Sequence, residues 1–339
     1  MTMATTSTPA ETLPSVKSDY LPILLPIVLA AAALPFIGNP VTWVTLTVAA
    51  LAMGMMIFVI ASGLTLVFGL MDVLNFGHGA FIAVGAYIAL SVLGLLSGWV
   101  QVDSLAWNLM ALGLAVVVAM AGTGLIGWAF ERVIVKPVYG QHLKQILITM
   151  GGLIVAEQLI HVIWGGDQKA MALPTALRGA VVLGDFAIEK FRILAVVVGL
   201  VVFAAMMLVL NRTKIGLLIR AGVENSEMVE ALGYRIRRLF VGVFVAGSAL
   251  AGLGGVMWAL YRETLTAAIG GDIMVLVFIV IIIGGLGSVG GCFLGAILVA
   301  MMANYTAFLA PKIALASNIL LMVAILMWRP QGLYPVAKR

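Results

Sequence analysis

The side chains that could carry out chemistry are few and widely separated along the 339 residues. His142 and His161 are too isolated for a metal site, and the single Cys292 excludes an internal disulfide or a cysteine-based metal cluster. No nucleophile is paired with a base, and no Gly-Lys dipeptide occurs, which excludes a phosphate-binding loop of the Walker type. We therefore expect that this chain is not an enzyme and binds no metal, nucleotide or other cofactor.

Two polar residues alternate with glycines near the end of a long apolar run, in the order Asn75, Gly77, His78, Gly79. Polar side chains within membrane spans usually face the interior of the bundle or a cavity. These residues either lie near a translocation path or have structural roles, with Asn75 capping a helix and His78 held by a hydrogen bond. The structural interpretation is the stronger one, because counting spans places this turn toward the cytoplasm.

Glu157 is the only acidic residue well inside an apolar run. It lies about two helical turns before Trp164. It either lines a path, pairs with a basic residue or reaches the outer membrane interface, and the sequence leaves these alternatives open.

The most polar part of the chain is residues 211–238, which is longer than a turn between two membrane helices requires. We expect it to form a docking surface for a cytoplasmic partner; the alternative is a solvated, positively charged loop. Three glutamates spaced by three residues lie along one side of a short predicted helix at 224–232, which Gly233 can end as a C-terminal cap. The residues predicted for this coupling loop are Thr213, Gly216, Glu224, Glu227, Glu230, Leu232 and Gly233.

The elements around these residues are apolar. The sequence is 63% hydrophobic and 10% charged, whereas a soluble domain is roughly 25% charged. Several runs reach the roughly 20 residues needed to cross a bilayer. We predict an all-α polytopic membrane protein of about eight to ten transmembrane or broken helices. The apolar segments are 20–37, 41–69, 76–97, 107–129, 145–164, 192–210, 238–260, 268–284, 289–309 and 312–328.

The predicted organisation has a disordered tail at 1–19, a transmembrane domain at 20–335 and a cytoplasmic tail at 336–339. The run 21–37 lacks the basic segment that precedes a signal-peptide core, so we expect it to be retained as a helix. Basic residues gather at 132–144, at 211–238 and after 328, which places these regions and both termini in the cytoplasm. The net charge of +5 therefore indicates membrane topology and not binding to nucleic acid.

A second glycine-rich stretch, Gly284–Gly291, separates two apolar runs. It lacks the lysine and the strand–helix context of a nucleotide site, so close helix packing or a re-entrant turn is the better interpretation. A weak internal repeat relates it to the first stretch, because Leu66-Val67-Phe68 recurs 210 residues later. Paired, glycine-interrupted segments indicate a path built from discontinuous helices. The predicted path residues are Asn75, Gly77, His78, Gly79, Glu157, Gly284, Gly285 and Gly287.

Five motifs in the same order resemble the branched-chain amino acid permease family, membrane subunits of bacterial ABC importers. They are Gly63–Leu70 with Asn75–Gly79 and Gly85–Tyr87, Glu131-Arg132 with Lys136-Pro137, Thr213–Gly216 through Glu224 to Tyr234, Gly284–Ser288, and Arg329–Leu333. The resemblance covers about residues 40–335. The sequence departs from the family at Gly77, where alanine is common, and at Glu157-Gln158, where Gln-Asn is common.

The resemblance implies a permease subunit of the bacterial inner membrane that moves branched-chain amino acids or related small solutes by alternating access. It implies a second permease subunit, two cytoplasmic ATPase subunits that use ATP and Mg, and a periplasmic solute-binding protein. Urea, short amides or aromatic acids are alternative solutes within the same family. A self-contained secondary transporter or channel is a weaker alternative, because ion-coupled transporters usually keep ionisable residues in their path.

Overall fold

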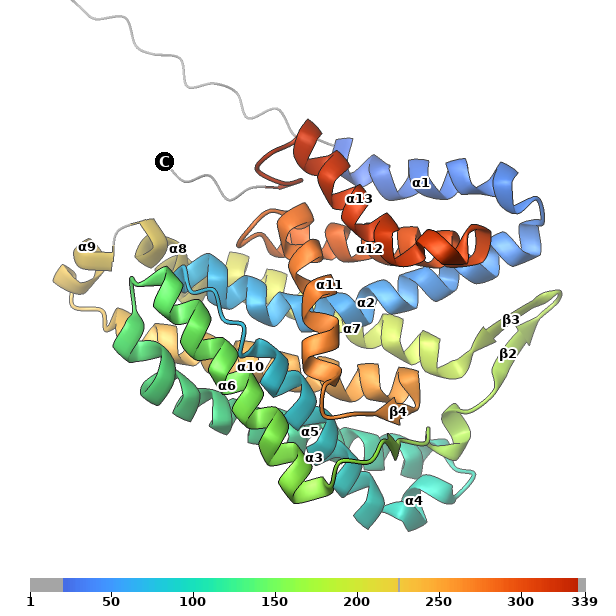
Figure 1. Ribbon diagram of the computed structural model, residues 1–339, viewed down its shortest axis with the longest axis horizontal. Coiled ribbons are helices and arrows are strands. Elements are labelled where there is room, and N and C mark those ends of the chain that lie inside the picture. Colours follow the sequence, from blue (N-terminus) through green and yellow to red (C-terminus); the bar gives the residue numbers. More distant parts are fainter. Residues whose placement is uncertain (1–20, 225, 335–339) are drawn as a thin grey trace, which may run out of the picture.

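The computed structural model describes residues 21–224 and 226–334 (Figure 1). Both predicted tails, 1–19 and 336–339, lie outside these residues. Each of the ten apolar segments forms one helix: α1 (Leu21–Ile37), α2 (Pro40–Met71), α3 (His78–Leu95), α5 (Leu105–Phe130), α6 (His142–Trp164), α7 (Lys190–Arg212), α10 (Ile236–Arg262), α11 (Ile269–Gly284), α12 (Val289–Leu309) and α13 (Ala314–Trp328).

In the described part of the chain, seven helices are long and apolar enough to cross a membrane. Three shorter apolar helices, α1, α11 and the Ala316–Trp328 part of α13, bring the number of apolar helices to ten. This confirms the predicted all-α membrane protein.

Helices α2 and α10 form the centre of the bundle. Helix α2 packs against α12, α10 and α7, whereas α10 packs against α2, α5 and α3. Glycines allow the close approach: a side chain at Gly63 would collide with the backbone of Gly247 on α10, and one at Gly85 on α3 would meet Gly252. In lipid, no hydrophobic effect drives two helices together. Small residues at such contacts let the backbones approach closely, and the helices are then stabilised by dispersion forces.

The beginnings of two helices follow from their capping residues. Asn39 accepts hydrogen bonds from the N–H groups of Val41 and Thr42 at 2.8 and 3.3 Å, and Pro40 occupies the first helical position of α2. Ser288 begins α12 by accepting the Gly291 N–H at 3.1 Å. These caps satisfy donors that the first turn of a helix leaves free.

Apart from the short helix predicted at 224–232, the sequence did not predict the short elements. At one end of the bundle, α8 (Lys214–Glu224) and α9 (Ser226–Ala231) connect α7 to α10. At the other end, β2 (Ala180–Leu183) and β3 (Phe186–Glu189) form an antiparallel hairpin (Figure 1). The remaining short elements are α4 (Ser97–Gln101), the π-helix η1 (Glu131–Val135), the 3₁₀ turns η2 (Lys136–Val138), η3 (Thr175–Leu177) and η4 (Pro311–Ile313), and β1 (Lys169–Ala170) paired antiparallel with β4 (Thr264–Leu265).

Candidate translocation site and coupling helices

The chain folds back into the bundle between α2 and α3. Asp72 ends α2 in the left-handed conformation, with φ 51°, and α3 then begins at His78. The His78 Nε2 lies 3.0 Å from the carbonyl oxygen of Ile60, a residue about 16 Å before the end of α2 along its axis. The turn therefore starts at the end of α2 and returns along that helix by about three helical turns before α3 begins.

The side chain of Asn75 is fully buried in this fold-back, at 0% exposure. Neither its Nδ2 nor its Oδ1 has a hydrogen-bond partner among the described residues. The predicted capping role is wrong, because the N-terminus of α3 at Gly77 receives no side-chain cap. A buried amide without partners destabilises the fold by about 1–3 kcal/mol, so such a group in a native structure calls for an explanation.

Two buried polar residues of α6, Gln145 and Thr149, were not selected from the sequence, and Thr149 holds the backbone next to Asn75. Thr149 accepts the N–H of Phe76 on its Oγ1 at 3.1 Å. Gln145, one turn earlier, is buried and donates its Nε2 to the carbonyl of Val138 at 3.1 Å, while its Oε1 has no partner among the described residues. Their i, i+4 spacing in an apolar helix is a signal that could have identified them.

The ring of Phe130, at the end of α5, packs over Gly77, two residues after Asn75. A Cβ at Gly77 would lie 2.5 Å from the Phe130 Cζ, and one at Gly152 of α6 would lie 2.5 Å from its Cε2. The ring also makes an edge contact with Phe81, with 5.4 Å between the centroids. Glycine at position 77 therefore leaves the space that this ring occupies.

The first turn of α11 lies beside the predicted residues of α3 and α6. A Cβ at Gly79 would be 2.9 Å from the carbonyl oxygen of Gly270, and one at Gly271 would be 3.3 Å from the Glu157 Oε1. The ionisable neighbours of Glu157 are Asp272 and His161. No ion pair between Glu157 and a basic side chain is found in the described residues, so the geometry does not support the predicted pairing.

The glycine-rich turn between α11 and α12 lies at the opposite end of α11, about 21 Å from Gly270. Gly285 and Gly287 adopt positive φ, 97° and 82°. The N–H groups of Leu333 and Tyr334 donate to the carbonyls of Ile283 and Gly284, at 2.8 and 3.0 Å, so the chain after α13 covers the turn. The predicted path residues thus separate into a group at the fold-back (Asn75, Gly77, His78, Gly79 and Glu157) and a group at this turn (Gly284, Gly285 and Gly287).

The joint between α7 and α8 is built by two of the predicted coupling residues. The Thr213 hydroxyl donates to the Val209 carbonyl at 2.6 Å and accepts the Gly216 N–H at 3.3 Å. A side chain at Gly216 would overlap the backbone of Leu210. Because the two helices meet so closely, a glycine is required here.

The predicted short helix of the coupling loop is α9, but it is shorter than expected. Glu224 ends α8, whereas Glu227 and Glu230 lie on α9, so the three acids do not share one helix. Gly233 has φ 87° and donates its N–H to the Glu230 carbonyl at 2.9 Å, as a C-terminal cap does.

Large apolar side chains project from these two short helices and the turn that follows. Met228 is 61% exposed, Leu232 70% and Tyr234 52%. On α8, Ile215 and Leu217 are also more than half exposed. A cluster of exposed apolar side chains rimmed by charged residues is typical of a protein–protein interaction surface.

Comparison with known proteins agrees with this architecture. Residues 46–328 match the family described as branched-chain amino acid transport system / permease component. The chain is similar to the high-affinity branched-chain amino acid transport system permease protein BraD of Pseudomonas aeruginosa, with 29% identity over 84% of this chain and 92% of BraD. It is also similar to two such permease proteins of Escherichia coli. With LivH it shares 28% identity over 81% of this chain and 89% of LivH, and with LivM 27% over 93% and 75%.

No solved structure matches the chain. The family match nevertheless covers most of the sequence and includes both interruptions and the coupling helices. This chain therefore belongs to the family of branched-chain amino acid transport system permease components and is a transport subunit, not an enzyme.

Proposed function

We propose that this chain is one of two permease subunits of an ATP-driven importer that moves branched-chain amino acids or related small solutes across the bacterial inner membrane. A periplasmic binding protein delivers the solute, and two cytoplasmic ATPase subunits drive alternating access with ATP and Mg. The relatives supply the solute class: LivH and LivM are both named as branched-chain amino acid permease proteins. The pairing of two related permeases is transferred from them.

The exposed apolar surface of α8 and α9 carries the proposal that ATPase subunits drive this chain. Met228, Leu232 and Tyr234 lie on a connection between two spans, at the opposite end of the bundle from the β2–β3 hairpin (Figure 1). Arg132 and Lys136 share a pocket with Arg237, so two of the basic regions lie together at this end. Basic residues concentrate on the cytoplasmic side of membrane proteins, which supports a cytoplasmic position for α8 and α9.

The fold-back at Asn75 supports a position for the solute path. An amide offers both a donor and an acceptor, and α3 turns its N-terminus, where backbone N–H groups are free, toward the middle of the bundle. In membrane transporters, such half-helix ends meet the solute. The Phe130 ring packs over Gly77, and we propose that its displacement during the cycle gives Asn75 access to a polar partner.

The coupling role can be tested in liposomes that contain this chain, its second permease subunit and the two ATPase subunits. The binding protein and leucine are either enclosed in the liposomes or added outside them. Gly233→Pro removes the N–H that caps α9 and cannot adopt a positive φ, and Glu227→Lys reverses a charge beside the exposed apolar side chains. We expect both variants to hydrolyse ATP with little leucine uptake. Gly184→Pro, in the β2–β3 turn where Gly184 also has a positive φ of 64°, is the matched control and should retain coupling.

Normal coupled uptake in both coupling variants would refute this role for α9. Competition with isoleucine, valine, urea, short amides and aromatic acids in the same liposomes identifies the solute. ATP-driven uptake of urea or a short amide without uptake of leucine would remove the branched-chain assignment while leaving the coupling role intact.

A further inference from the structure

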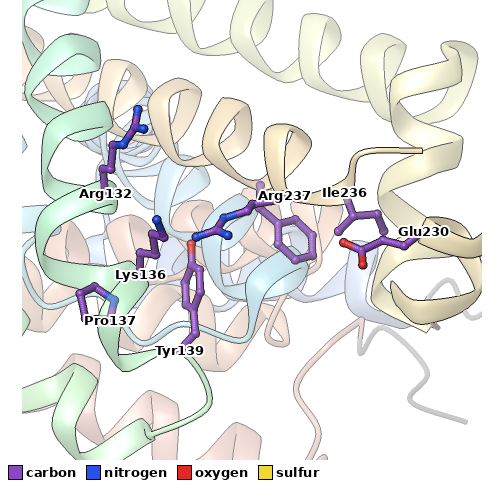
Figure 2. Close-up of a pocket in the computed structure, with 8 residues that line it drawn as sticks. Arg132, Lys136, Pro137, Tyr139, Glu230, Ile236 and Arg237 are labelled. Atoms are coloured by element: carbon purple, nitrogen blue, oxygen red, sulfur yellow. The ribbon is translucent and has the colours of Figure 1, made fainter. Parts of the chain in front are cut away.

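Two adjacent pockets lie along the seam between α5 and α10. The first has a volume of about 480 Å³ and is lined by three basic side chains, Arg132, Lys136 and Arg237, with one carboxylate, Glu230. Figure 2 shows Lys136, Tyr139 and Arg237 pointing toward one another across the space between the two segments. In the described residues, none of the three basic side chains forms an ion pair. The pocket is therefore electropositive.

The π-helix η1 explains how the basic residues reach this pocket. Its wider turn, in which the Lys136 N–H donates to the Glu131 carbonyl, directs Arg132 and Lys136 outward and buries the Glu131 side chain at 2% exposure. The Tyr139 hydroxyl donates to the Glu131 Oε1 at 2.5 Å. Burial, together with this hydrogen bond, raises the pKa of Tyr139, so its phenol stays protonated. Glu131 is thus hydrogen-bonded to Tyr139, and among the described residues it forms no ion pair with the basic side chains of the pocket.

The second pocket continues along the same two helices and is almost entirely apolar. Its volume is about 450 Å³, and small residues on both helices leave it open. The pockets meet at Trp128, because the Arg132 guanidinium lies over its ring at 5.6 Å from the centroid. The lining residues are Met120, Ala121, Gly124, Leu125 and Trp128 on α5, and Gly242, Val245, Ala246 and Ala249 on α10.

We propose that this seam binds one anionic phospholipid, with the phosphate of its headgroup in the basic pocket and an acyl chain in the apolar groove. From Arg237 to Ala249 the seam extends about 18 Å along α10, which suits a headgroup followed by the upper part of a chain. Trp128 lies where the two pockets meet. Tryptophan is enriched at membrane–water interfaces, which is where the headgroup of a bound lipid would join its acyl chain. Basic pockets between helices on the cytoplasmic side are suited to anionic headgroups.

A helix of the second permease subunit is the competing occupant, because small residues also favour helix packing. The charges decide between them. A helix laid along the groove would cover the basic pocket at its end and strip water from three cations, which is unfavourable unless each cation finds a partner. A phospholipid supplies that negative charge together with the apolar chain. The inference depends on the proposed function only through the cytoplasmic orientation of this end.

The test uses the full-length chain purified with its second permease subunit and exchanged into equal amounts of phosphatidylglycerol and phosphatidylcholine. Native mass spectrometry then counts the lipids retained after a mild detergent wash. We expect the wild-type protein to prefer phosphatidylglycerol by about fivefold for each basic contact. The triple variant Arg132→Gln, Lys136→Gln, Arg237→Gln should lose this preference, whereas Lys144→Gln, Lys214→Gln, Arg235→Gln, which changes three basic residues outside the pocket, should keep it.

The groove is tested with Gly242→Leu, which should reduce phosphatidylglycerol retention by filling the space for the chain. A Cβ at Gly242 meets no atom within 4 Å, and the same is true of Gly113 on α5, so Gly113→Leu is the matched control. Unchanged selectivity in the triple variant would overturn the proposal. If Gly242→Leu lost the second permease subunit but still retained lipid, the groove would be assigned to protein. If only the triple variant lost phosphatidylglycerol, and Gly242→Leu retained it, the pocket would bind an anion without an acyl chain in the groove. Lipid retention is independent of transport, so a failure here is separate from a failure of the proposed function.

Discussion

The two interruptions of the helical pattern are the fold-back before α3 and the glycine-rich turn before α12, and they differ in how their polar groups are satisfied. In the turn, Gly285 and Gly287 adopt positive φ, and the backbone of Leu333 and Tyr334 donates to the carbonyls at the end of α11. In the fold-back, the backbone is held by His78 and Thr149, but both amide atoms of Asn75 have no partner among the described residues.

This difference separates a structural joint from a candidate site. Irregular backbone within a membrane must be satisfied by protein or by water, and the turn meets that requirement through its own chain. The fold-back meets it for the backbone and leaves the Asn75 side chain unpaired among the described residues, which destabilises this conformation. Because the unpaired Asn75 amide lowers stability in this conformation, we expect it to act in another state of the transport cycle. The following variants test the distinction between the turn and the fold-back.

The largest effect is expected from Gly291→Ala at the turn. The added methyl group would overlap the carbonyl oxygen of Gly284, and both sides of this contact are backbone that cannot move aside. We expect a loss of about 3 kcal/mol in the free energy of unfolding, measured as a lower thermal midpoint in detergent. Gly290→Ala is the control, because a Cβ there meets nothing within 4 Å. Equal midpoints for the two variants would show that the turn is not tightly packed.

A smaller loss, about 2 kcal/mol, is expected from Thr149→Val at the fold-back. Valine keeps the shape of threonine but cannot accept the N–H of Phe76, which lies 3.1 Å from the Thr149 hydroxyl. In Thr45→Val the lost hydroxyl bonds, among the described residues, to the carbonyl of Val41 in its own helix alone, so the midpoint should hardly change. If both variants had the same midpoint, the hydrogen bond to Phe76 would not hold the fold-back in place.

The positions of the apolar helices could be predicted from the sequence because hydropathy records which runs are long enough to lie in lipid. The return of α3 to the middle of the bundle could not, since it depends on His78 reaching the carbonyl of Ile60 on a different helix. Hydropathy does not record which residues of two neighbouring spans meet, so this contact left no signal in the apolar pattern. The β1–β4 pair was missed for a similar reason, because its two-residue strands come from distant connections.

Within the candidate site, the sequence identified Asn75 and His78 as polar residues in apolar surroundings but assigned Asn75 the wrong role. Whether a buried amide is a cap or an unpaired group depends on which side chains arrive beside it, and Thr149 and Phe130 come from other helices. The coupling loop shows the same limit. Gly233 could be predicted as a cap from its type and position, whereas the spacing of the three glutamates by three residues gave no sign that they are divided between α8 and α9.

The third variant, Asn75→Leu, should separate stability from transport. Removing an unpaired buried amide is expected to leave the thermal midpoint unchanged or raised, while leucine uptake falls about tenfold, or 1.4 kcal/mol in the barrier. The control is the equally buried Asn108, which donates to the Trp99 carbonyl at 2.7 Å and accepts the Ala176 N–H at 2.7 Å. Asn108→Leu should lower the midpoint. Normal uptake by Asn75→Leu would place the solute path elsewhere.

The smallest effect, about 1 kcal/mol, is expected from Ser288→Ala, which removes the N-cap of α12. The Ser288 hydroxyl accepts the Gly291 N–H at 3.1 Å, and Ser288→Thr keeps that oxygen, so threonine should restore most of the thermal midpoint. Because the turn is a joint, uptake per folded permease should equal that of the wild type in both variants. A selective loss of uptake in Ser288→Ala, at an unchanged midpoint, would mean that the turn takes part in the transport cycle. The contrast with Asn75 would then be one of degree, since both interruptions would contribute to the moving path.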